Sequence, residues 1–263
     1  KISNNGGFFA FAGWNKVYLF SFDLIEPVWI SNESNDLDGE RITGFDISDE
    51  GTNFAVSTYD KLYSFSINET FEVKREWLFD GGNDPSNTNN EGFDTLAISG
   101  DGSYIVASIG VSYSVTYFFS SANEIPHWVR AGDTRVNVLE MSYSGDYIVS
   151  GRQNGVGYRG GVEFINSTNG IAIWTYEYGS IHNVAISETG DYVAAGTIAH
   201  DNSGGTPEYV VNPSILLFSR YNNTPLLNYT NGYHQSQNNI VNIDISMDER
   251  YIIAQSQMNL VSI

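Results

Sequence analysis

Apolar and polar positions return in the same order six times along this chain. Three of the copies are ISETGDYVAAG (186–196), ISGDGSYIVAS (98–108) and MSYSGDYIVSG (141–151). In these copies apolar residues stand five and two positions before the leading Ile or Met, and this grouping predicts a short strand. A second apolar run follows the glycine and predicts a second strand. The chain is therefore expected to be a repeat protein.

A glycine recurs four positions after the leading residue, within an S-x-x-G pattern. A glycine supplies the positive φ that a tight hairpin turn requires, and the serine can hydrogen-bond the turn backbone. The glycines of the first five copies are Gly6, Gly51, Gly102, Gly145 and Gly190, and Glu249 takes their place in the sixth. The two strands are therefore expected to form a tight hairpin.

Two further strands complete each repeat. The third strands are expected at 16–22, 61–67, 115–121, 161–167, 214–220 and 259–263. The fourth carries a Trp in PVWIS, REWLF, PHWVR and AIWTY, with Leu227 in its place in the fifth repeat. Four short antiparallel strands in a repeat of 43 to 59 residues are typical of a β-propeller blade.

The predicted fold class is all-β, a single β-propeller domain spanning residues 1–263. Its 17 Tyr, 15 Phe and 26 Gly favour strands and tight turns over helices. Six four-stranded blades are expected, or seven if a further repeat lies outside the chain, and the last blade is incomplete within it. The approximate repeats are 1–31, 41–80, 92–131, 135–178, 180–231 and 239–263.

The order of motifs carries a resemblance over essentially the whole chain. V-x-x-[AL]-x-I-S-x-x-G-x-Y-[IV]-[AV]-x-G, then [VI]-x-L-F, then P-x-W-x-Y is similar to the WD40-like, PQQ-like repeat propellers of archaeal surface and secreted proteins. The chain departs from true WD40 proteins because it has no Gly-His pair before the first strand and no Trp-Asp pair closing the third. The resemblance implies a propeller that is secreted or at the cell surface, while propellers in general host binding, scaffolding and catalysis alike.

Charge and composition narrow the classes of partner. Twelve Lys and Arg against 31 Asp and Glu give a net charge of −19, which repels nucleic acid and anionic membrane surfaces. No apolar run reaches the roughly 18 residues of a membrane span, so no transmembrane segment is expected in this chain. Cysteine does not occur, which leaves neither a disulfide framework nor a thiolate metal site.

Polar positions of the first strand are candidate binding residues, since in a propeller this strand lines the central channel. Four positions before the leading residue stand Thr43, Asp94, Asn137 and His182, which are expected near the channel mouth. One position before it stand Asp46, Glu140 and Asp244, whose carboxylates could hold a hard cation such as calcium. The alternative is that they are hydrated channel residues. No other cofactor is expected.

Long irregular loops are the other candidate binding elements. They lie at 79–92, 152–161 and 197–213, all at one end of the sheets, where sequence variation on a rigid scaffold commonly serves binding. The alternative is that they are solvated connections. The segment NESNDLDGE (32–40) partly matches a calcium loop but has Phe45 at the twelfth position instead of Glu, and it is interpreted as an acidic turn.

Five N-x-S/T sequons are candidate glycosylation sites, at Asn32, Asn68, Asn166, Asn222 and Asn228. Three of them follow the third strand of a blade, where a glycan would not disturb packing. Asn is also a preferred turn residue, so the repeated placement has a structural explanation of similar weight.

The expected function is noncatalytic: an extracellular or cell-surface scaffold that binds protein or glycan. The unfinished last blade would leave an open sheet edge, which another strand can join. A homo-oligomer or filament built by strand addition is one interpretation, and a longer polypeptide is the other. The alternative from a different class is a propeller hydrolase or oxidoreductase with an axial site, although no G-x-S-x-G elbow or P-loop occurs.

Overall fold

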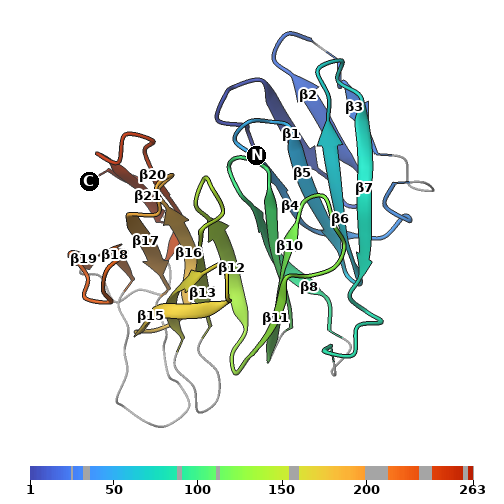
Figure 1. Ribbon diagram of the computed structural model, residues 1–263. Coiled ribbons are helices and arrows are strands. Elements are labelled where there is room, and N and C mark those ends of the chain that lie inside the picture. The colour runs from blue at the N-terminus through green and yellow to red at the C-terminus, as the bar shows by residue number, and fades with distance from the viewer. Residues whose placement is uncertain are drawn as a thin grey trace. The chain divides into compact units, whose positions relative to one another are not determined.

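The computed structural model describes residues 1–24, 26–31, 36–87, 91–110, 113–153, 160–198, 213–230, 239–256 and 260–262. Within these ranges the secondary structure consists of 22 β-strands and contains no helix, which confirms the all-β class (Figure 1). The strands form six antiparallel sheets that follow one another in chain order, as the blades of a propeller do. Each sheet corresponds to one predicted repeat.

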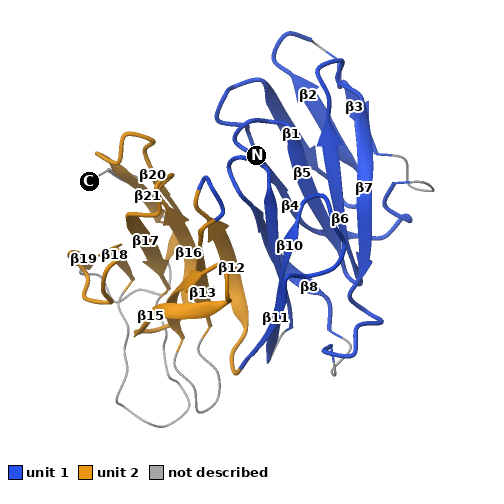
Figure 2. Ribbon diagram, in the orientation of Figure 1, with its two compact units in different colours: residues 1–132, 143–145 blue, residues 133–142, 146–263 orange. Residues whose placement is uncertain are grey.

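The chain divides into two compact units, coloured separately in Figure 2. Unit 1 contains residues 1–132 and 143–145, and unit 2 contains residues 133–142 and 146–263. The boundary falls between the third and fourth repeats, so each unit holds three sheets. The expectation of a single domain stays a prediction.

Unit 1 contains the first three sheets. The first is β1 (Phe8–Ala12), β2 (Val17–Ser21) and β3 (Trp29–Ile30); the second is β4 (Ile42–Ile47), β5 (Asn53–Thr58), β6 (Lys61–Ile67) and β7 (Val73–Asp80); the third is β8 (Phe93–Ile98), β9 (Tyr104–Ile109), β10 (Ser114–Ser120) and β11 (Trp128–Gly132).

Unit 2 contains the other three sheets. The fourth is β12 (Val136–Met141), β13 (Tyr147–Arg152), β14 (Gly161–Asn166) and β15 (Ile171–Glu177); the fifth is β16 (Ile181–Ile186), β17 (Tyr192–Thr197), β18 (Ser214–Ser219) and β19 (Leu227–Thr230); the sixth is β20 (Ile240–Ile245), β21 (Ile252–Ser256) and β22 (Leu260–Ser262).

The turn between the first two strands is the same in all six repeats. The five glycines have φ between 69° and 75°, and Glu249 in the sixth has φ 57°, so the predicted left-handed position is confirmed. The serine of the motif accepts a hydrogen bond through Oγ from the backbone N–H that opens the second strand, at 3.0 Å in Tyr104 and 3.1 Å in Tyr147. The S-x-x-G motif therefore forms and stabilises the turn between the first two strands.

The core of each unit lies between consecutive sheets. Strand β5 shows how one strand serves two interfaces, because its side chains alternate between faces. Phe54 and Val56 pack with residues of the first sheet, while Ala55 packs with the third sheet. Both faces are apolar, as expected for a strand between two packed sheets.

The predicted Trp column is present in the outer strands β3, β7, β11 and β15. Trp77 packs at a tilt against Phe119 of the following sheet with ring centroids 5.2 Å apart, and its Nε1 donates to the Ser121 carbonyl at 2.7 Å. Trp174 repeats this in unit 2, 5.2 Å from Phe218 and 3.0 Å from the Arg220 carbonyl. The indole therefore joins consecutive sheets by packing and by a hydrogen bond.

Candidate functional site

The predicted channel-mouth residues share one backbone feature, a β-bulge. The pairing register shifts at the same place in β4, β8, β12, β16 and β20. The extra residue at each shift is Thr43, Asp94, Asn137, His182 or Val241. A bulge bends a strand and re-aims one side chain. These residues are therefore equivalent in structure as well as in sequence.

The apolar spacing contains the signal for this bulge. Val136, Leu139 and Met141 are all buried, although the first two stand three residues apart. In a regular strand, residues three apart point to opposite faces. Only an inserted residue between them places both on the packed side. Buried apolar residues five and two positions before the leading residue thus predict the bulge. The sequence analysis did not draw this conclusion.

The bulge side chains differ in what they contact. Thr43 donates through Oγ1 to the Thr58 carbonyl at 3.0 Å, within its own sheet. Asn137 donates through Nδ2 to the Ile181 carbonyl of the fifth sheet at 2.9 Å. His182 is exposed and Asp94 is half-buried. Thr43 and Asn137 therefore stabilise the fold, and His182 is the bulge residue most accessible to solvent.

The three candidate metal-ligating carboxylates have unlike surroundings. Asp46 is buried; it lies 3.2 Å from Lys1 Nζ and accepts a hydrogen bond from the Ile98 N–H at 3.1 Å. Asp244 is exposed and accepts from the N–H of the next residue, and Glu140 is half-buried on β12. No group of three His, Asp or Glu side chains with a metal-binding arrangement occurs among the described residues. Calcium at this position stays a prediction.

The loop-bearing end of unit 1 gathers polar side chains around Lys61, at the start of β6. Its Nζ donates to Asp38 Oδ2 at 2.6 Å and lies 3.4 Å from Glu40 Oε1. Thr58 donates through Oγ1 to Glu40 Oε2 at 2.7 Å. The hydrogen bond to Asp38 raises the pKa of Lys61 above its ordinary value. These contacts with Lys61 and Thr58 therefore hold the predicted acidic turn against the second sheet.

The loop that follows β7 is shaped by its own polar side chains. Asp80 accepts from the N–H and Nδ2 of Asn83 at 3.1 and 2.8 Å. Asn87 donates to the carbonyls of Gly81 and Glu91 at 3.1 and 2.8 Å, which fixes both sides of the loop. These are local side-chain to backbone bonds of the kind that stabilise turns.

Two buried tyrosines lie beneath these loops at equivalent positions of β6 and β10. Tyr63 and Tyr117 are both fully buried, and the Tyr117 hydroxyl donates to Asp84 Oδ1 at 3.3 Å. Burial raises the pKa of Tyr63 to about 12, and the charge of Asp38 adds to this. Burial likewise raises the pKa of Tyr117. The Y-x-F pattern in both third strands is the sequence signal for these residues.

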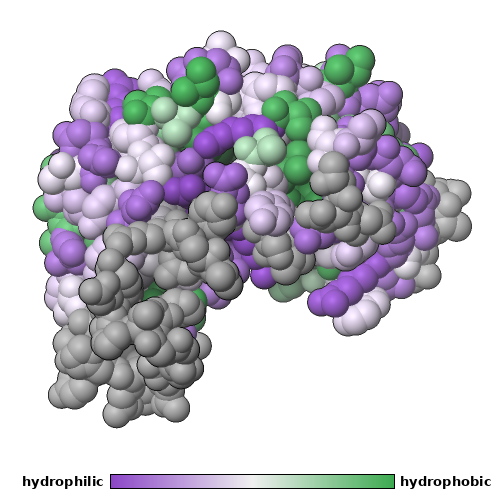
Figure 3. Space-filling view, turned by 90° about the horizontal axis from the view of Figure 1, so that it is seen from below, coloured by the Kyte–Doolittle hydropathy of each residue, from purple (hydrophilic) through white to green (hydrophobic). Residues whose placement is uncertain are grey.

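Acidic residues dominate this end of unit 1. The described residues of 36–40, 59–61 and 80–91 contain seven Asp or Glu and one Lys, and we call this set the acidic end. Figure 3 views the molecule from the side on which β7 ends and β8 begins, and hydrophilic side chains cover much of the described surface there. The acidic end therefore presents a negative potential to solvent.

Parts of the other candidate loops lie outside the described residues. These parts are 154–159 and 199–212, together with 88–90 of the loop after β7 and the sequon Asn32. The candidate site is accordingly built from the described residues of unit 1.

Three sequons adopt one turn. The side-chain Oδ1 of Asn68, Asn166 and Asn222 accepts from the N–H two residues later at 3.0, 2.9 and 2.9 Å. Asn123 makes the same turn with the N–H of Ile125 at 2.9 Å and is not a sequon. The turn therefore accounts for an Asn at this place, whether or not a glycan is attached. Asn228 lies exposed in β19.

No protein-family model matches this chain, and no curated protein matches its sequence. Among the described residues, no helix has the length and apolar character that a membrane crossing would require. The evidence for a propeller-like architecture is therefore the series of antiparallel sheets itself.

Proposed function

We propose that this chain is a noncatalytic, six-bladed β-propeller, secreted or held at a cell surface, that binds protein or glycan and assembles with copies of itself. The observation that carries the binding role is the contrast between the two ends of the sheets in unit 1. One end has short, uniform S-x-x-G turns, and the other has long loops rich in acidic residues. Binding residues concentrate in variable loops on rigid scaffolds.

The repeated polar residues have structural tasks, which supports a role in binding over catalysis. The motif serines bond the turn backbone, and the Trp indoles bond carbonyls of the next sheet. The Asn side chains after the third strands make turns. The residues that differ between repeats, such as those of the acidic end, would define a partner. Two of them, Asp80 and Asp84, also stabilise their loop through bonds with Asn83 and the Tyr117 hydroxyl.

The charge of the acidic end indicates the kind of partner. Seven acidic residues against one Lys favour a protein surface rich in Lys and Arg. Complementary charges accelerate encounter and suppress wrong partners. Binding of this kind weakens as salt is added, because exposed charges are screened over about 8 Å at 0.15 M salt.

The test compares two charge-matched triple variants. Asp60→Asn, Asp80→Asn and Asp84→Asn removes three charges of the acidic end while keeping an acceptor oxygen at each position. Glu26→Gln, Glu69→Gln and Glu124→Gln removes three exposed charges elsewhere in unit 1. The probes are a biotinylated oligolysine peptide and a printed glycan array, with binding measured at 50 and 300 mM salt.

We expect the acidic-end variant to bind oligolysine about tenfold more weakly than wild type, with a change below about twofold for the control. Equal weakening in both variants would assign the effect to net charge and contradict a localised site. Binding to a glycan that both variants retain would place the partner site elsewhere.

A surface location predicts glycans at the described sequons. Asn222 is exposed, while Asn68 donates through Nδ2 to Glu72 at 2.8 Å and Asn166 is half-buried. We therefore expect Asn222 to be occupied most fully. Intact mass of the protein from its native source, before and after glycosidase, tests this, and a single unmodified mass would contradict it.

A further inference from the structure

An exposed aromatic residue lies in the same turn of each sheet in unit 1. This turn joins the second and third strands, at the loop-bearing end of the sheets. It carries Trp14 in the first sheet, Tyr59 in the second and Tyr113 in the third, which are 71%, 53% and 54% exposed. We call these three residues the aromatic row. Large aromatic side chains left in solvent on three consecutive sheets mark an interaction surface.

The first two of these turns are held by the next sheet in the same way. The Ile42 N–H, at the start of β4, donates to the Trp14 carbonyl at 2.8 Å, and the Phe93 N–H, at the start of β8, donates to the Tyr59 carbonyl at 2.9 Å. Ile42 and Phe93 stand at the same position of the repeat, five residues before the leading Ile. Trp14 and Tyr59 are therefore attached to the rigid sheets of unit 1 at equivalent points.

Each of these two rings is supported from one side. The Arg41 guanidinium lies over the Trp14 ring, 4.6 Å from its centroid. The Tyr59 ring packs against the backbone of Gly92, where an added Cβ would overlap the ring. Both side chains nevertheless remain more than half exposed. Rings that are already held in place lose little conformational entropy when a ligand stacks on them.

The aromatic row lies wholly within unit 1 and at the ends of its strands. Consecutive sheets cover one another by their faces, as Phe54 and Val56 show where the second sheet packs on the first. The turns at the strand ends are outside this face-to-face packing. The aromatic row therefore needs no uncovered sheet face to be accessible to a ligand.

The chemistry around the aromatic row matches the rings of a carbohydrate. A hexose ring has an apolar C–H face, which can stack on an aromatic ring, and an edge of hydroxyl groups, which needs polar partners. Asn15 and Arg41 adjoin Trp14, and Asp60 directly follows Tyr59. Each ring thus combines an apolar surface with polar groups at its rim, as a sugar-binding site requires.

The spacing of the sheets and the local charge define the sugar further. Packed sheets lie about 10 Å apart, so aromatic rings on neighbouring sheets are too far apart to stack on one hexose. An oligosaccharide, with several hexose rings in succession, can reach both. The acidic end contains seven Asp or Glu and one Lys, and it would repel an anionic polysaccharide. The ligand is therefore expected to be neutral.

We propose that the aromatic row binds a neutral, linear oligosaccharide whose hexose rings stack on Trp14 and Tyr59, with Tyr113 extending the row to the third sheet. The inference names the site and the ligand class for the glycan part of the proposed function and rests on that part. Because the ligand has no net charge, salt has little to screen. The binding should therefore be insensitive to salt, unlike the binding of a basic protein to the acidic end.

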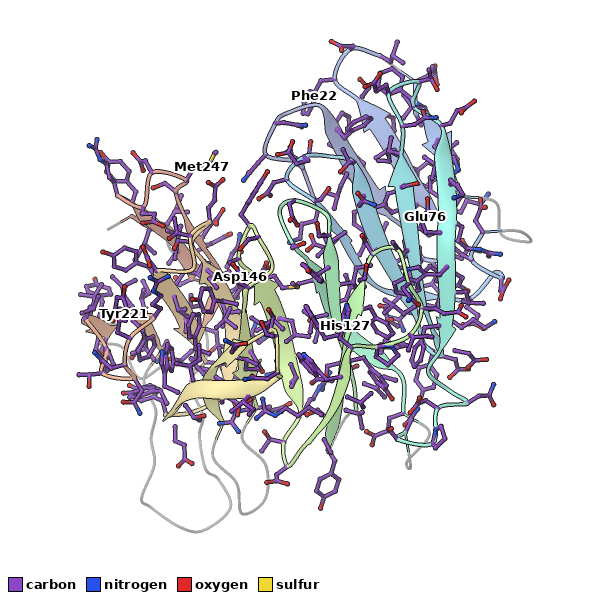
Figure 4. The ribbon with its side chains drawn as sticks, in the orientation of Figure 1. Phe22, Glu76, His127, Asp146, Tyr221 and Met247 are labelled. Carbon is purple, nitrogen blue, oxygen red and sulfur yellow. The ribbon has the colours of Figure 1, made fainter. Side chains whose placement is uncertain are left out.

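The experiment is titration calorimetry at 50 and 300 mM salt. The probes are cellohexaose, laminarihexaose, mannohexaose and maltohexaose, with glucose and mannose as single rings and a heparin hexasaccharide as the anionic probe. The variants are Trp14→Ala, Tyr59→Ala, the double variant, and Trp14→Phe, which keeps an aromatic ring. The control is Tyr221→Ala, which removes an exposed Tyr from the turn after β18, labelled in Figure 4. Circular dichroism and melting temperature establish that each variant is folded.

We expect wild type to bind at least one of the neutral hexasaccharides, and to bind it more tightly than the single sugars. Trp14→Ala and Tyr59→Ala should each weaken this binding about five- to tenfold, and the double variant should weaken it more than either. Trp14→Phe and Tyr221→Ala should change it less than about threefold. The change between 50 and 300 mM salt should be below about twofold.

Three results would overturn the inference. Hexasaccharide binding that neither Trp14→Ala nor Tyr59→Ala weakens would place the glycan site elsewhere and leave the proposed function intact. Tighter binding of the heparin hexasaccharide than of every neutral one would contradict a neutral ligand. Wild type that binds no neutral hexasaccharide would also overturn it, and the oligolysine measurement would then decide separately whether the acidic end binds a basic protein.

Discussion

The second and fourth sheets share a backbone plan and differ in the chemistry of one face. Their turns are alike, with Gly51 at φ 69° and Gly145 at φ 73°. At equivalent positions of the third strand, however, β6 has Tyr63 and Phe65, and β14 has Glu163 and Ile165. The repeat therefore determines strands and turns, while the residues on the faces decide how each sheet packs.

The two faces obtain stability from different interactions. Phe65 is fully buried and stacks on Phe54 with centroids 4.7 Å apart, so dispersion and apolar burial dominate. Glu163 is 8% exposed and lies 3.8 Å from Arg152 Nη1, so electrostatics contribute on the fourth sheet. A buried ion pair offsets its own desolvation only in part. Substitutions on the two faces should therefore change the free energy of unfolding by different amounts.

The largest effect is expected for Phe65→Ala. The change removes contacts with Phe54 and Trp29 and leaves a cavity in unit 1. We expect a loss of about 3–5 kcal/mol in the free energy of unfolding. Urea denaturation followed by Trp fluorescence measures it, with Phe65→Leu as the control that keeps most of the volume. A loss below about 1 kcal/mol would contradict a tightly packed aromatic face.

The next effect is the response of the same face to alkaline pH. The folded pKa of Tyr63 is raised to about 12 from an ordinary 10.0. Below pH 10 the phenol is neutral in both states; between pH 10 and 12 it ionises only when unfolded, so the free energy of unfolding falls as pH rises. We expect a fall of about 2–3 kcal/mol from this residue.

The control for the alkaline response is Tyr63→Phe, which has no ionisable group. The fall between pH 10 and 12 should be smaller by about the same 2–3 kcal/mol. Urea midpoints at pH 9, 10, 11 and 12 give both curves. Parallel curves for the variant and the wild type would show that Tyr63 does not respond to pH in the way its burial requires.

Glu163→Gln probes the polar face and should have a smaller effect. The substitution keeps the size of the side chain and removes the attraction to Arg152, whose Nε is buried without a hydrogen-bond partner among the described residues. We expect a loss of about 1–2 kcal/mol. Because the pair is buried, salt screens it little, and the loss should persist in 0.5 M salt. A loss as large as that of Phe65→Ala would remove the distinction between the two faces.

The parts that sequence predicts well are those that repeat. These are the S-x-x-G turns, the Trp column and the correspondence of repeats to sheets. Each depends on residues that have the same structural role in every repeat. The bulges at Thr43 and Asn137 were missed because spacing was interpreted as a regular strand. For the acidic end, the sequence predicted the loop at 79–92 as a binding element and 32–40 as an acidic turn. It did not predict the approach of Lys61 to Asp38, which depends on how two connections meet in space.

The smallest effect is expected at Glu249, where a substitution tests whether the turns of the sheets are equivalent. This residue occupies the left-handed region at φ 57°, where Gly190 of the fifth sheet has φ 75°. Glu249→Gly removes that backbone strain. It also removes the exposed hydrogen bond that Thr189 Oγ1 donates to Glu249 Oε1 at 2.6 Å. Since an exposed bond contributes little, we expect a net gain of about 0.5 kcal/mol. Thr189→Val isolates the hydrogen bond. Gly6→Ala gives the cost of a side chain at an equivalent turn, about 1 kcal/mol, because an added Cβ there meets no atom within 4 Å. A loss of stability in Glu249→Gly would mean that the sixth turn depends on its side chain, and the turns would then not be equivalent.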